Sequence, residues 1–369
     1  MKKYIYADNA ATSRLDDAAF DAMLPYLKDN YANPSQPYSF SRKAKQALKD
    51  SRRIIAECIN ANPNEIFFTS GGTESDNWAI KCFASADDAS CVVTSAIEHH
   101  AVLNAARNHI TLPVDNHGCV NPEILSEILD RPHDSEKTLV SVMLANNEIG
   151  TIEPIQELAA AAHKRGALFH TDAVQAVGHI PVDVKKLGVD MLSASAHKFN
   201  GPKGVGFLYS KNGLLRSFHD GGSQESGLRA GTENVAYIVA MAAALKTNCN
   251  TLQMNTQRLL ETENMFISEL NKSNINYIRN GSPNHIPGSV NISIKNSDGE
   301  MLLHRLDLMG ICVSTGSACD SVNTQVSHVI KAIGVPDEYA RGTIRISFGK
   351  YNTPEEAAEI ARAISKICI

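Results

Sequence analysis

The alternation of strand-like and helix-like runs between about residues 64 and 247 is the feature that most constrains the fold. Short apolar runs typical of buried strands cover residues 65–70, 91–95, 138–145, 167–173, 190–196 and 205–210. Helical patterns follow several of these runs, at residues 74–84, 99–109 and 155–166. Strands that alternate with helices predict an α/β fold whose mostly parallel sheet is covered on both faces.

The pattern changes after about residue 250. The expected elements are a long polar helix at 257–273, a half-exposed strand at 289–294, a helix at 299–310, a strand at 343–349 and a final helix that begins at Pro354. This pattern is typical of a smaller α+β domain. We therefore predict a large domain of residues 14–247 and a small α+β domain of residues 1–13 and 248–369.

Composition excludes several classes of function. The formal net charge of −5 and the pI of about 6.2 leave no chain-wide basic surface for direct binding of nucleic acid. No apolar run approaches the roughly 18 residues of a membrane span, and no signal peptide is recognisable at the start. The eight cysteines form neither a C-x-x-C pair nor a zinc pattern, which predicts no metal site and favours the reducing cytoplasm.

Three chemical features gather at the ends of expected strands. Lys198 follows one strand, and Asp172 ends another, at the edge where open parallel sheets bind ligands. A third strand runs into Gly71, Gly72 and Thr73, and the helix that starts there can bind a phosphate through its free N–H groups. A lysine, an acid and a phosphate site together indicate pyridoxal phosphate, which binds a lysine through its aldehyde and an acid through its ring nitrogen.

Cys319 lies in "VSTGSACDSV" (313–322), among residues too small to pack a core. An idle loop cysteine is one explanation. A thiol with a chemical role is the other.

The order of the motifs makes the chain recognisable. It contains "YADNAAT", "NPS", "FTSGGTESDN", "EHHAVL", "ANNEIGT", "HTDAVQAVG", "SAHKFNGPKGVG", "RAGTEN", "STGSAC", "SHV" and "GTIRISFG" in this order. From about residue 4 to 355 it resembles the cysteine desulfurases of the class V aminotransferase group, of the nitrogen-fixation and iron–sulfur-cluster types. This resemblance implies pyridoxal phosphate fold type I and a homodimer with active sites at the subunit interface.

The resemblance also implies roles for individual residues. Lys198, Cys319 and His99 match the Schiff-base lysine, the sulfur-accepting nucleophile and the histidine stacked on the cofactor ring. Further matches bind the cofactor: Asp172 at the ring nitrogen, Gln175 near the ring hydroxyl, Gly72, Thr73, Ser195 and His197 at the phosphate, and Thr232 at the phosphate from the other subunit. Asn147 matches a contact to the ring hydroxyl or to the substrate. Arg345 matches the arginine that binds the substrate carboxylate, with Asn33 assisting, whereas His100 has no implied role.

The implied reaction converts L-cysteine to L-alanine. The sulfur passes to Cys319 as a persulfide and then to an acceptor protein, either an iron–sulfur scaffold or a thiolation enzyme such as one acting on tRNA. One alternative is a related pyridoxal phosphate aminotransferase or selenocysteine lyase, in which Cys319 is incidental. A sulfur carrier or scaffold without catalysis is another.

The chain departs from the family pattern at several loop positions. These are Tyr38, Ser41, Ser223, Ser226, Asp320, Gln325 and Val326. None of the residues matched to the cofactor is lost. The departures concern the behaviour of the loops, the choice of acceptor and the turnover.

Overall fold

A computed structural model describes residues 4–83, 90–131, 137–211, 213–315 and 326–368. Its larger part is built on one seven-stranded sheet with strand order β2-β8-β7-β6-β5-β3-β4. The strands are β2 (Ile66–Thr69), β3 (Ser90–Ser95), β4 (His109–Leu112), β5 (Lys137–Ser141), β6 (Leu168–Asp172), β7 (Met191–Ser195) and β8 (Gly206–Ser210). All neighbours pair in parallel except β8, which is antiparallel to β2 and β7, so the predicted mostly parallel sheet is confirmed.

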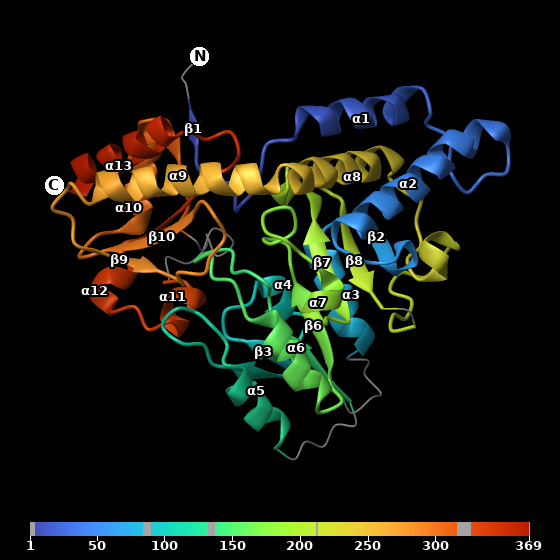
Figure 1. Cartoon of the computed structure of the whole chain (residues 1–369), viewed down its shortest axis with the longest axis horizontal. Coiled ribbons are helices and arrows are strands. Elements are labelled where there is room, and N and C mark those ends of the chain that lie inside the picture. The colour runs from blue at the N-terminus through green and yellow to red at the C-terminus, as the bar shows by residue number, and fades with distance from the viewer. Residues whose placement is uncertain (1–3, 84–89, 132–136, 212, 316–325, 369) are drawn as a thin grey trace.

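Helices cover both faces of this sheet (Figure 1). They are α1 (Asp17–Lys28), α2 (Arg42–Cys58), α3 (Gly72–Phe83), α4 (His100–Leu103), α5 (Pro122–Leu129), α6 (Ile155–His163), α7 (Val184–Leu187) and α8 (Val235–Asn250). Successive strand residues enter different cores: Val93 and Leu192 pack with α1, α2, α6 and α8, whereas Val92 and Met191 pack with α3 and α4. Adjacent residues of one strand enter different cores because successive side chains point to opposite faces of the sheet.

The C-terminal part has smaller sheets. β10 (Ser289–Ile294) lies between β9 (Tyr277–Asn280) and β12 (Thr343–Ser347), and β1 (Ile5–Tyr6) pairs with β11 (Ile311–Cys312). The helices are α9 (Leu252–Leu270), α10 (Gly299–Leu308), α11 (His328–Ala332), α12 (Asp337–Ala340) and α13 (Pro354–Cys368). This part has its own hydrophobic core, which includes Phe266, Ile292 and Ile344. The division at residues 14 and 247 stays a prediction, supported by these separate cores.

The prediction that residues 289–294 form a half-exposed strand is wrong in one respect, because all six residues of β10 are buried. Val290, Ile292 and Ile294 enter the C-terminal core. The other face carries polar side chains that are also covered: the Asn280 amide donates to Asn291 Oδ1 (2.7 Å), and the Asn291 amide donates to the Glu148 carbonyl (3.1 Å). The polar face therefore joins the small sheet to the large part, next to the site described below.

Two local predictions differ in length. The helix expected at 99–109 is the single turn α4, because the chain then turns into β4, an edge strand without a clear signal in the sequence. The strand expected at 138–145 ends at Ser141 in β5, although the N–H groups of Val142 and Leu144 still donate to carbonyls of His170 and Asp172. The last helix begins at Pro354, as predicted.

Candidate active site

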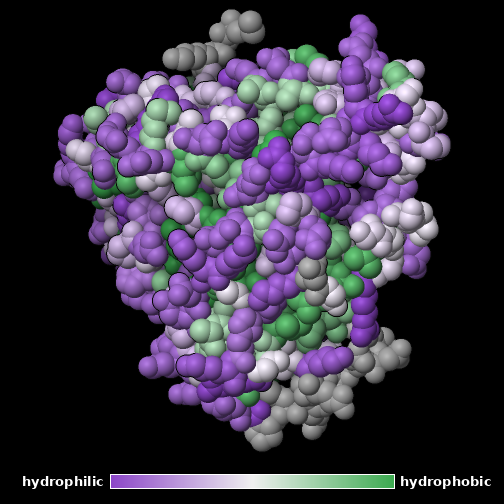
Figure 2. Space-filling view, turned by 45° about the vertical axis from the view of Figure 1, so that its right-hand side comes forward, coloured by the Kyte–Doolittle hydropathy of each residue, from purple (hydrophilic) through white to green (hydrophobic). Residues whose placement is uncertain are grey.

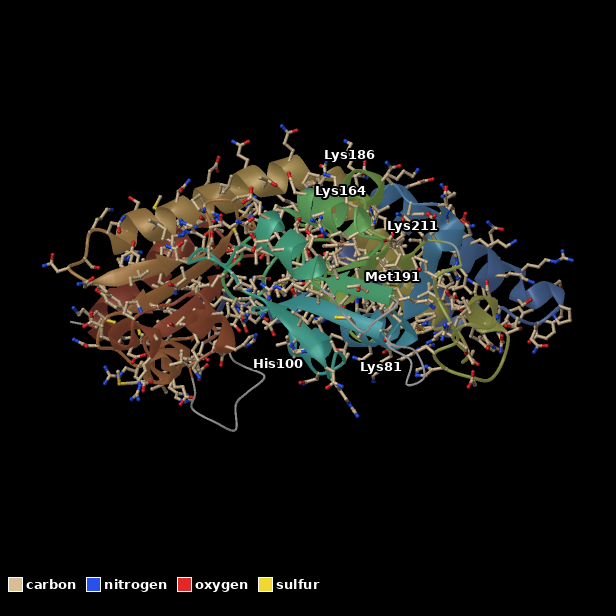
Figure 3. All side chains as sticks on the ribbon, turned by 90° about the horizontal axis from the view of Figure 1, so that it is seen from below. Lys81, His100, Lys164, Lys186, Met191 and Lys211 are labelled. Carbon is tan, nitrogen blue, oxygen red and sulfur yellow. The ribbon has the colours of Figure 1, made fainter. Side chains whose placement is uncertain are left out.

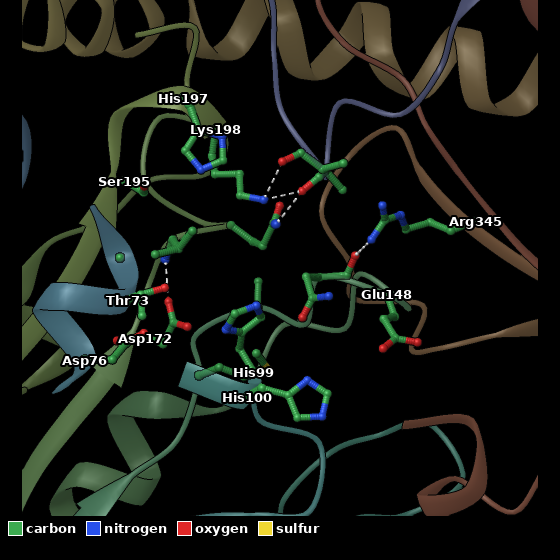
Figure 4. A pocket seen from close by; sticks show the side chains of 18 of the residues that line it. Thr73, Asp76, His99, His100, Glu148, Asp172, Ser195, His197, Lys198 and Arg345 are labelled. Atoms are coloured by element: carbon green, nitrogen blue, oxygen red, sulfur yellow. Dashed lines mark hydrogen bonds between the residues drawn. The ribbon is translucent and has the colours of Figure 1, made fainter. Parts of the chain in front are cut away.

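One cavity of about 340 Å³ gathers most of the predicted site residues at the carboxyl ends of β6 and β7. Those that line it are Gly72, Thr73, His99, Asn147, Asp172, Gln175, Ser195, His197, Lys198 and Arg345. Figure 4 shows Thr73, Asp172, His99 and Lys198 directed toward a common space, with Arg345 at the opposite end from Thr73. Residues far apart in the sequence thus form one site between the large sheet and β12.

The start of α3 forms the end of the cavity near Thr73. In the first turn of a helix the N–H groups have no acceptor inside the helix, so those of Gly72 and Thr73 can bind an anion. A Cβ atom on Gly72 would lie 2.6 Å from Val174 Cγ2 and 3.6 Å from Ser195 Cβ. Only glycine therefore lets this helix approach the ends of β6 and β7 so closely.

Substitution of Gly72 by alanine should displace the start of α3. We expect the free energy of unfolding to fall by about 1–3 kcal/mol, as for other overpacked sites, and cofactor binding to weaken. Thermal unfolding and equilibrium cofactor binding measure the two effects. The double variant Gly72→Ala/Val174→Ala removes the clashing methyl and should recover part of both losses. If the single variant behaved like the unmodified protein, the close packing would not matter.

Asp172 ends β6 and is only 5% exposed. Its Oδ1 accepts a hydrogen bond from the N–H of Val174 (2.9 Å). Burial raises the pKa of Asp172, while the nearby charges of His99 and Lys198 act in the opposite direction. A ligand that brings positive charge to this carboxyl would stabilise its ionised form.

His99 is the N-cap of α4, and its Nδ1 accepts the N–H of Ala101 (3.1 Å). This bond assigns the proton of the neutral ring to Nε2. Burial lowers the pKa of His99, so the ring remains neutral near pH 7. His197 behaves similarly, because burial and the adjacent Lys198 lower the pKa of His197 to about 4.

Lys198 lies just beyond β7, and its ammonium group is held by main-chain carbonyls. Nζ donates to the oxygens of Ala10 (2.6 Å) and Ala11 (2.9 Å), and the Gln175 amide donates to the same Ala10 oxygen (2.9 Å). Lys198 and Gln175 thus share one acceptor. The amine therefore faces the cavity from a fixed position.

Arg345 projects from β12 at the far end of the cavity, and its side chain is only 4% exposed. Nη1 donates to the Asn147 carbonyl (2.9 Å), and Nη2 donates to Asp8 Oδ1 (2.7 Å). A planar guanidinium held in this way can present its remaining N–H groups to a carboxylate.

These residues fit pyridoxal phosphate. The glycine-dependent helix start suits the phosphate, and the buried carboxyl of Asp172 suits a protonated ring nitrogen. Lys198 lines the same cavity. The phosphate site, Asp172, Lys198 and Arg345 thus share one cavity, with Arg345 at the end away from Thr73.

Two predicted site residues lie elsewhere in the structure. Thr232 is exposed and lines a separate hollow with Arg229 and Gly231. Asn33 does not line the cavity, and its Oδ1 accepts the N–H of Ser35 (2.9 Å). Cys319 lies outside the described residues.

The cavity is also lined by residues for which no role was predicted. Asp76, Glu148, His100, Ser327 and His328 are among its lining residues. Asp76 lies one helical turn after Gly72, on the same face of α3. This i, i+4 spacing is the sequence signal that could have predicted Asp76 as a site residue. The rings of His100 and His328 lie 5.0 Å apart, and the view of Figure 3 shows His100 between the C-terminal elements and the large sheet. Only the fold brings these two histidines together.

The described part of the chain lacks two kinds of feature. None of the helices in residues 4–368, apart from the gaps given above, combines the length and apolar character of a membrane-spanning segment. Within the same described ranges, His, Cys, Asp and Glu side chains form no cluster that could hold a metal ion.

Comparisons with known proteins agree with the geometry. The family model described as Aminotransferase class-V matches residues 5–360. The cysteine desulfurase IscS of Dictyoglomus turgidum is 47% identical over 367 residues, which cover 96% of this chain and 92% of that protein. Among solved structures, a NifS-like protein superposes with a TM-score of 0.92 at 36% identity and covers 99% of both chains. SspA in complex with cysteine gives 0.81 at 32% identity, over 94% of this chain and 99% of that one. The chain therefore belongs to the class-V aminotransferase family and, within it, to the group of the IscS and NifS cysteine desulfurases.

Proposed function

We propose that the protein is a pyridoxal phosphate-dependent cysteine desulfurase. It converts L-cysteine to L-alanine and transfers the sulfur to its own Cys319 as a persulfide, from which an acceptor protein takes it. The observation that carries this proposal is a single cavity that joins the α3 helix start, Asp172, Lys198 and Arg345. The relatives' names, and the neighbour solved with cysteine, support the same reaction.

Several residues that line the cavity have a proposed role in cofactor binding. Gly72, Thr73, Ser195 and His197 bind the phosphate, Asp172 binds the ring nitrogen, and Lys198 binds the aldehyde. Asn147 and Gln175 lie near the ring hydroxyl, and His99 lies on the ring face. When bound, pyridoxal phosphate supplies an electron sink for negative charge at the substrate Cα.

The protein's own groups carry out the remaining steps. Arg345 binds the substrate carboxylate and so orients Cα toward Lys198. Lys198 Nζ, once free, takes the proton from Cα, and the proton on His99 Nε2 assists the later transfers. The Cys319 thiolate forms an S–S bond with the substrate sulfur while the C–S bond breaks and its electron pair remains with the carbon. Protonation of that carbon completes alanine.

Product analysis tests this proposal. The holoenzyme with L-cysteine and a thiol reductant should give alanine and sulfide in equal amounts. A keto acid would identify an aminotransferase. Activity with selenocysteine alone would identify a selenocysteine lyase, and an inert protein that merely carries sulfur would identify a carrier or scaffold.

The pH dependence should report on His99. Because burial lowers the pKa of His99, the acidic limb of kcat/KM should fall below the ordinary histidine value of about 6.5. The rate is lost as the pH falls through the pKa of the folded protein, where the ring becomes charged. The His99→Gln variant should lose this limb together with most of its activity, whereas the neighbouring control His100→Gln should keep the limb. An identical limb in His99→Gln would show that another group titrates.

We also propose that the protein is a homodimer. In this dimer Thr232 contacts the phosphate in the partner's site, and Asn33 helps to bind the substrate carboxylate. Thr232 is exposed and lies outside its own chain's cavity, as a residue acting across an interface requires. Apolar side chains are exposed on α1 and the segment after it. Those side chains are Phe20, Leu24, Leu27, Tyr31, Tyr38 and Phe40. Figure 2 shows hydrophobic areas among the hydrophilic surface of the side that it turns forward.

A mixed dimer tests the proposed role of Thr232. One chain carries Thr232→Ala and the other carries Lys198→Ala. If Thr232 acts across the interface, both lesions fall in one site, and about half of the activity remains. If it acts within its own chain, each site has a lesion and little activity remains.

The compartment and the acceptor are further proposals. We infer that the protein works in the cytoplasm, because the seven cysteines in the described part of the chain are free thiols. The acceptor is an iron–sulfur scaffold or a thiolation enzyme, including one for tRNA. Direct binding of nucleic acid is not part of the proposal, given the net charge of −5.

A further inference from the structure

The inference concerns Asp8, a carboxylate that is already bound to the proposed substrate arginine. Its Oδ1 accepts Arg345 Nη2 at 2.7 Å, and the two side chains are 19% and 4% exposed. Asp8 is held in register with the strand that carries Arg345. The N–H of Ser347 donates to the Ala7 carbonyl (2.8 Å), and the N–H of Asn9 donates to the Ser347 carbonyl (3.1 Å).

The guanidinium is therefore oriented before a substrate arrives. Asp8 takes one N–H of Nη2 and the Asn147 carbonyl takes one N–H of Nη1. A second N–H remains on each terminal nitrogen, and together these two can donate to one carboxylate. A buried arginine without Asp8 would lose this orientation.

The charges at this end of the cavity limit what else can bind. Asp8 neutralises Arg345, and Glu148, which is 4% exposed, lines the cavity beside Arg345 (Figure 4). One carboxylate can still bind through directed hydrogen bonds. Asp8 does not itself line the cavity, but it already balances the charge of Arg345, and the Glu148 carboxyl offers no positive charge. A second negative group on the same ligand would therefore find no counter-charge on Arg345, and such an unmatched charge is a common source of specificity.

We propose that Asp8 is a positioning and specificity-determining residue, which holds Arg345 for one carboxylate and disfavours amino acids that carry a second acidic group. This inference rests on the proposed function, because it takes Arg345 as the site of the substrate carboxylate. It defines the substrate class as α-amino acids with an uncharged side chain, which includes cysteine with a protonated thiol.

The test compares two amino acids that bind the holoenzyme, L-alanine and L-aspartate, by titration of the absorbance of the bound cofactor. The unmodified protein should prefer L-alanine. Asp8→Asn keeps an acceptor for Arg345 and removes the charge, so the preference should shrink by about tenfold, mainly through tighter binding of L-aspartate. Asp16→Asn is the matched control, because Asp16 forms a similar covered ion pair with Lys350 away from the cavity lining, and it should leave the preference unchanged.

Several outcomes would overturn the inference. One is that the unmodified protein binds L-alanine and L-aspartate with equal affinity. Another is that Asp8→Asn weakens the binding of both amino acids equally, as expected if Asp8 has a purely structural role. If Asp8→Asn does not fold, Asp8→Ser is read in the same way, because its hydroxyl can also accept from Arg345. The titration does not depend on turnover. Failure to form alanine from L-cysteine would reject the proposed function separately.

Discussion

Substitution of Lys198 by alanine should abolish the covalent attachment of the cofactor and nearly all activity. The amine of Lys198 is in the cavity, close enough to Gln175 to share the Ala10 carbonyl with it, and methyl groups cannot replace it. The rate of alanine formation should fall by roughly three to four orders of magnitude, because the variant loses the proposed acid–base group. Borohydride reduction followed by peptide mapping should find the cofactor on residue 198 of the unmodified protein only.

Lys203→Ala is the matched control, since Lys203 is an exposed lysine in the same glycine-rich segment. It should keep both the adduct and the activity. A borohydride-stable adduct on another lysine in the Lys198→Ala variant would contradict the assignment. The fold itself should survive, because Lys198 belongs to the cavity wall rather than to the hydrophobic clusters.

Substitution of Cys319 by serine should separate cofactor chemistry from sulfur transfer. Cofactor binding and the absorbance change on addition of L-cysteine should persist, because the residues that line the cavity are unchanged. Alanine formation should fall on the order of a thousandfold or more, as when other catalytic nucleophiles are removed, since a hydroxyl attacks sulfur poorly. Parallel measurement of the absorbance change and of alanine release distinguishes the two stages.

Cys312→Ser is the control for this variant. Cys312 precedes Cys319 by seven residues and lies at the end of β11, half-buried. Its variant should retain alanine formation. Full turnover by Cys319→Ser would instead leave Cys319 as an incidental loop cysteine and would favour the aminotransferase or lyase alternative.

The sequence predicted the large sheet well because its strands are buried on both faces. Continuous apolar runs such as residues 190–196 and 205–210 are strong signals of this burial. β4 was not predicted, because "HITL" is short and follows a helical pattern that α4 uses for one turn only. Pairing with β3 decides its conformation, and a sequence pattern does not contain that information.

The burial of β10 illustrates a second limit. Its alternation of apolar and polar residues is the pattern of a strand with one solvated face. In the structure the polar face is covered and hydrogen-bonded, with Asn280 donating to Asn291 and Ser293 (2.7 Å each). Polar residues at an interface between two parts of a chain cannot be distinguished in sequence from residues in water.

Side chains at the ends of strands could be predicted to line the site. Contacts made by main-chain atoms, and pairs of residues far apart in the chain, could not. The gathering of Asp172, Lys198 and Gly72 followed from their positions at strand ends. The carbonyls of Ala10 and Ala11 that hold Lys198 leave no mark in residue identity. The pairing of Asp8 with Arg345 joins residues 337 positions apart, so only the folded chain reveals it.

A single-turnover experiment tests the central claim most directly. The holoenzyme is mixed with one equivalent of L-cysteine without reductant, alanine is quantified, and the protein is digested and mapped by mass spectrometry. We expect one alanine per active site and one additional sulfur atom on the peptide that contains Cys319. Alanine without sulfur on that peptide, or sulfur on Cys319 without alanine, would contradict the account.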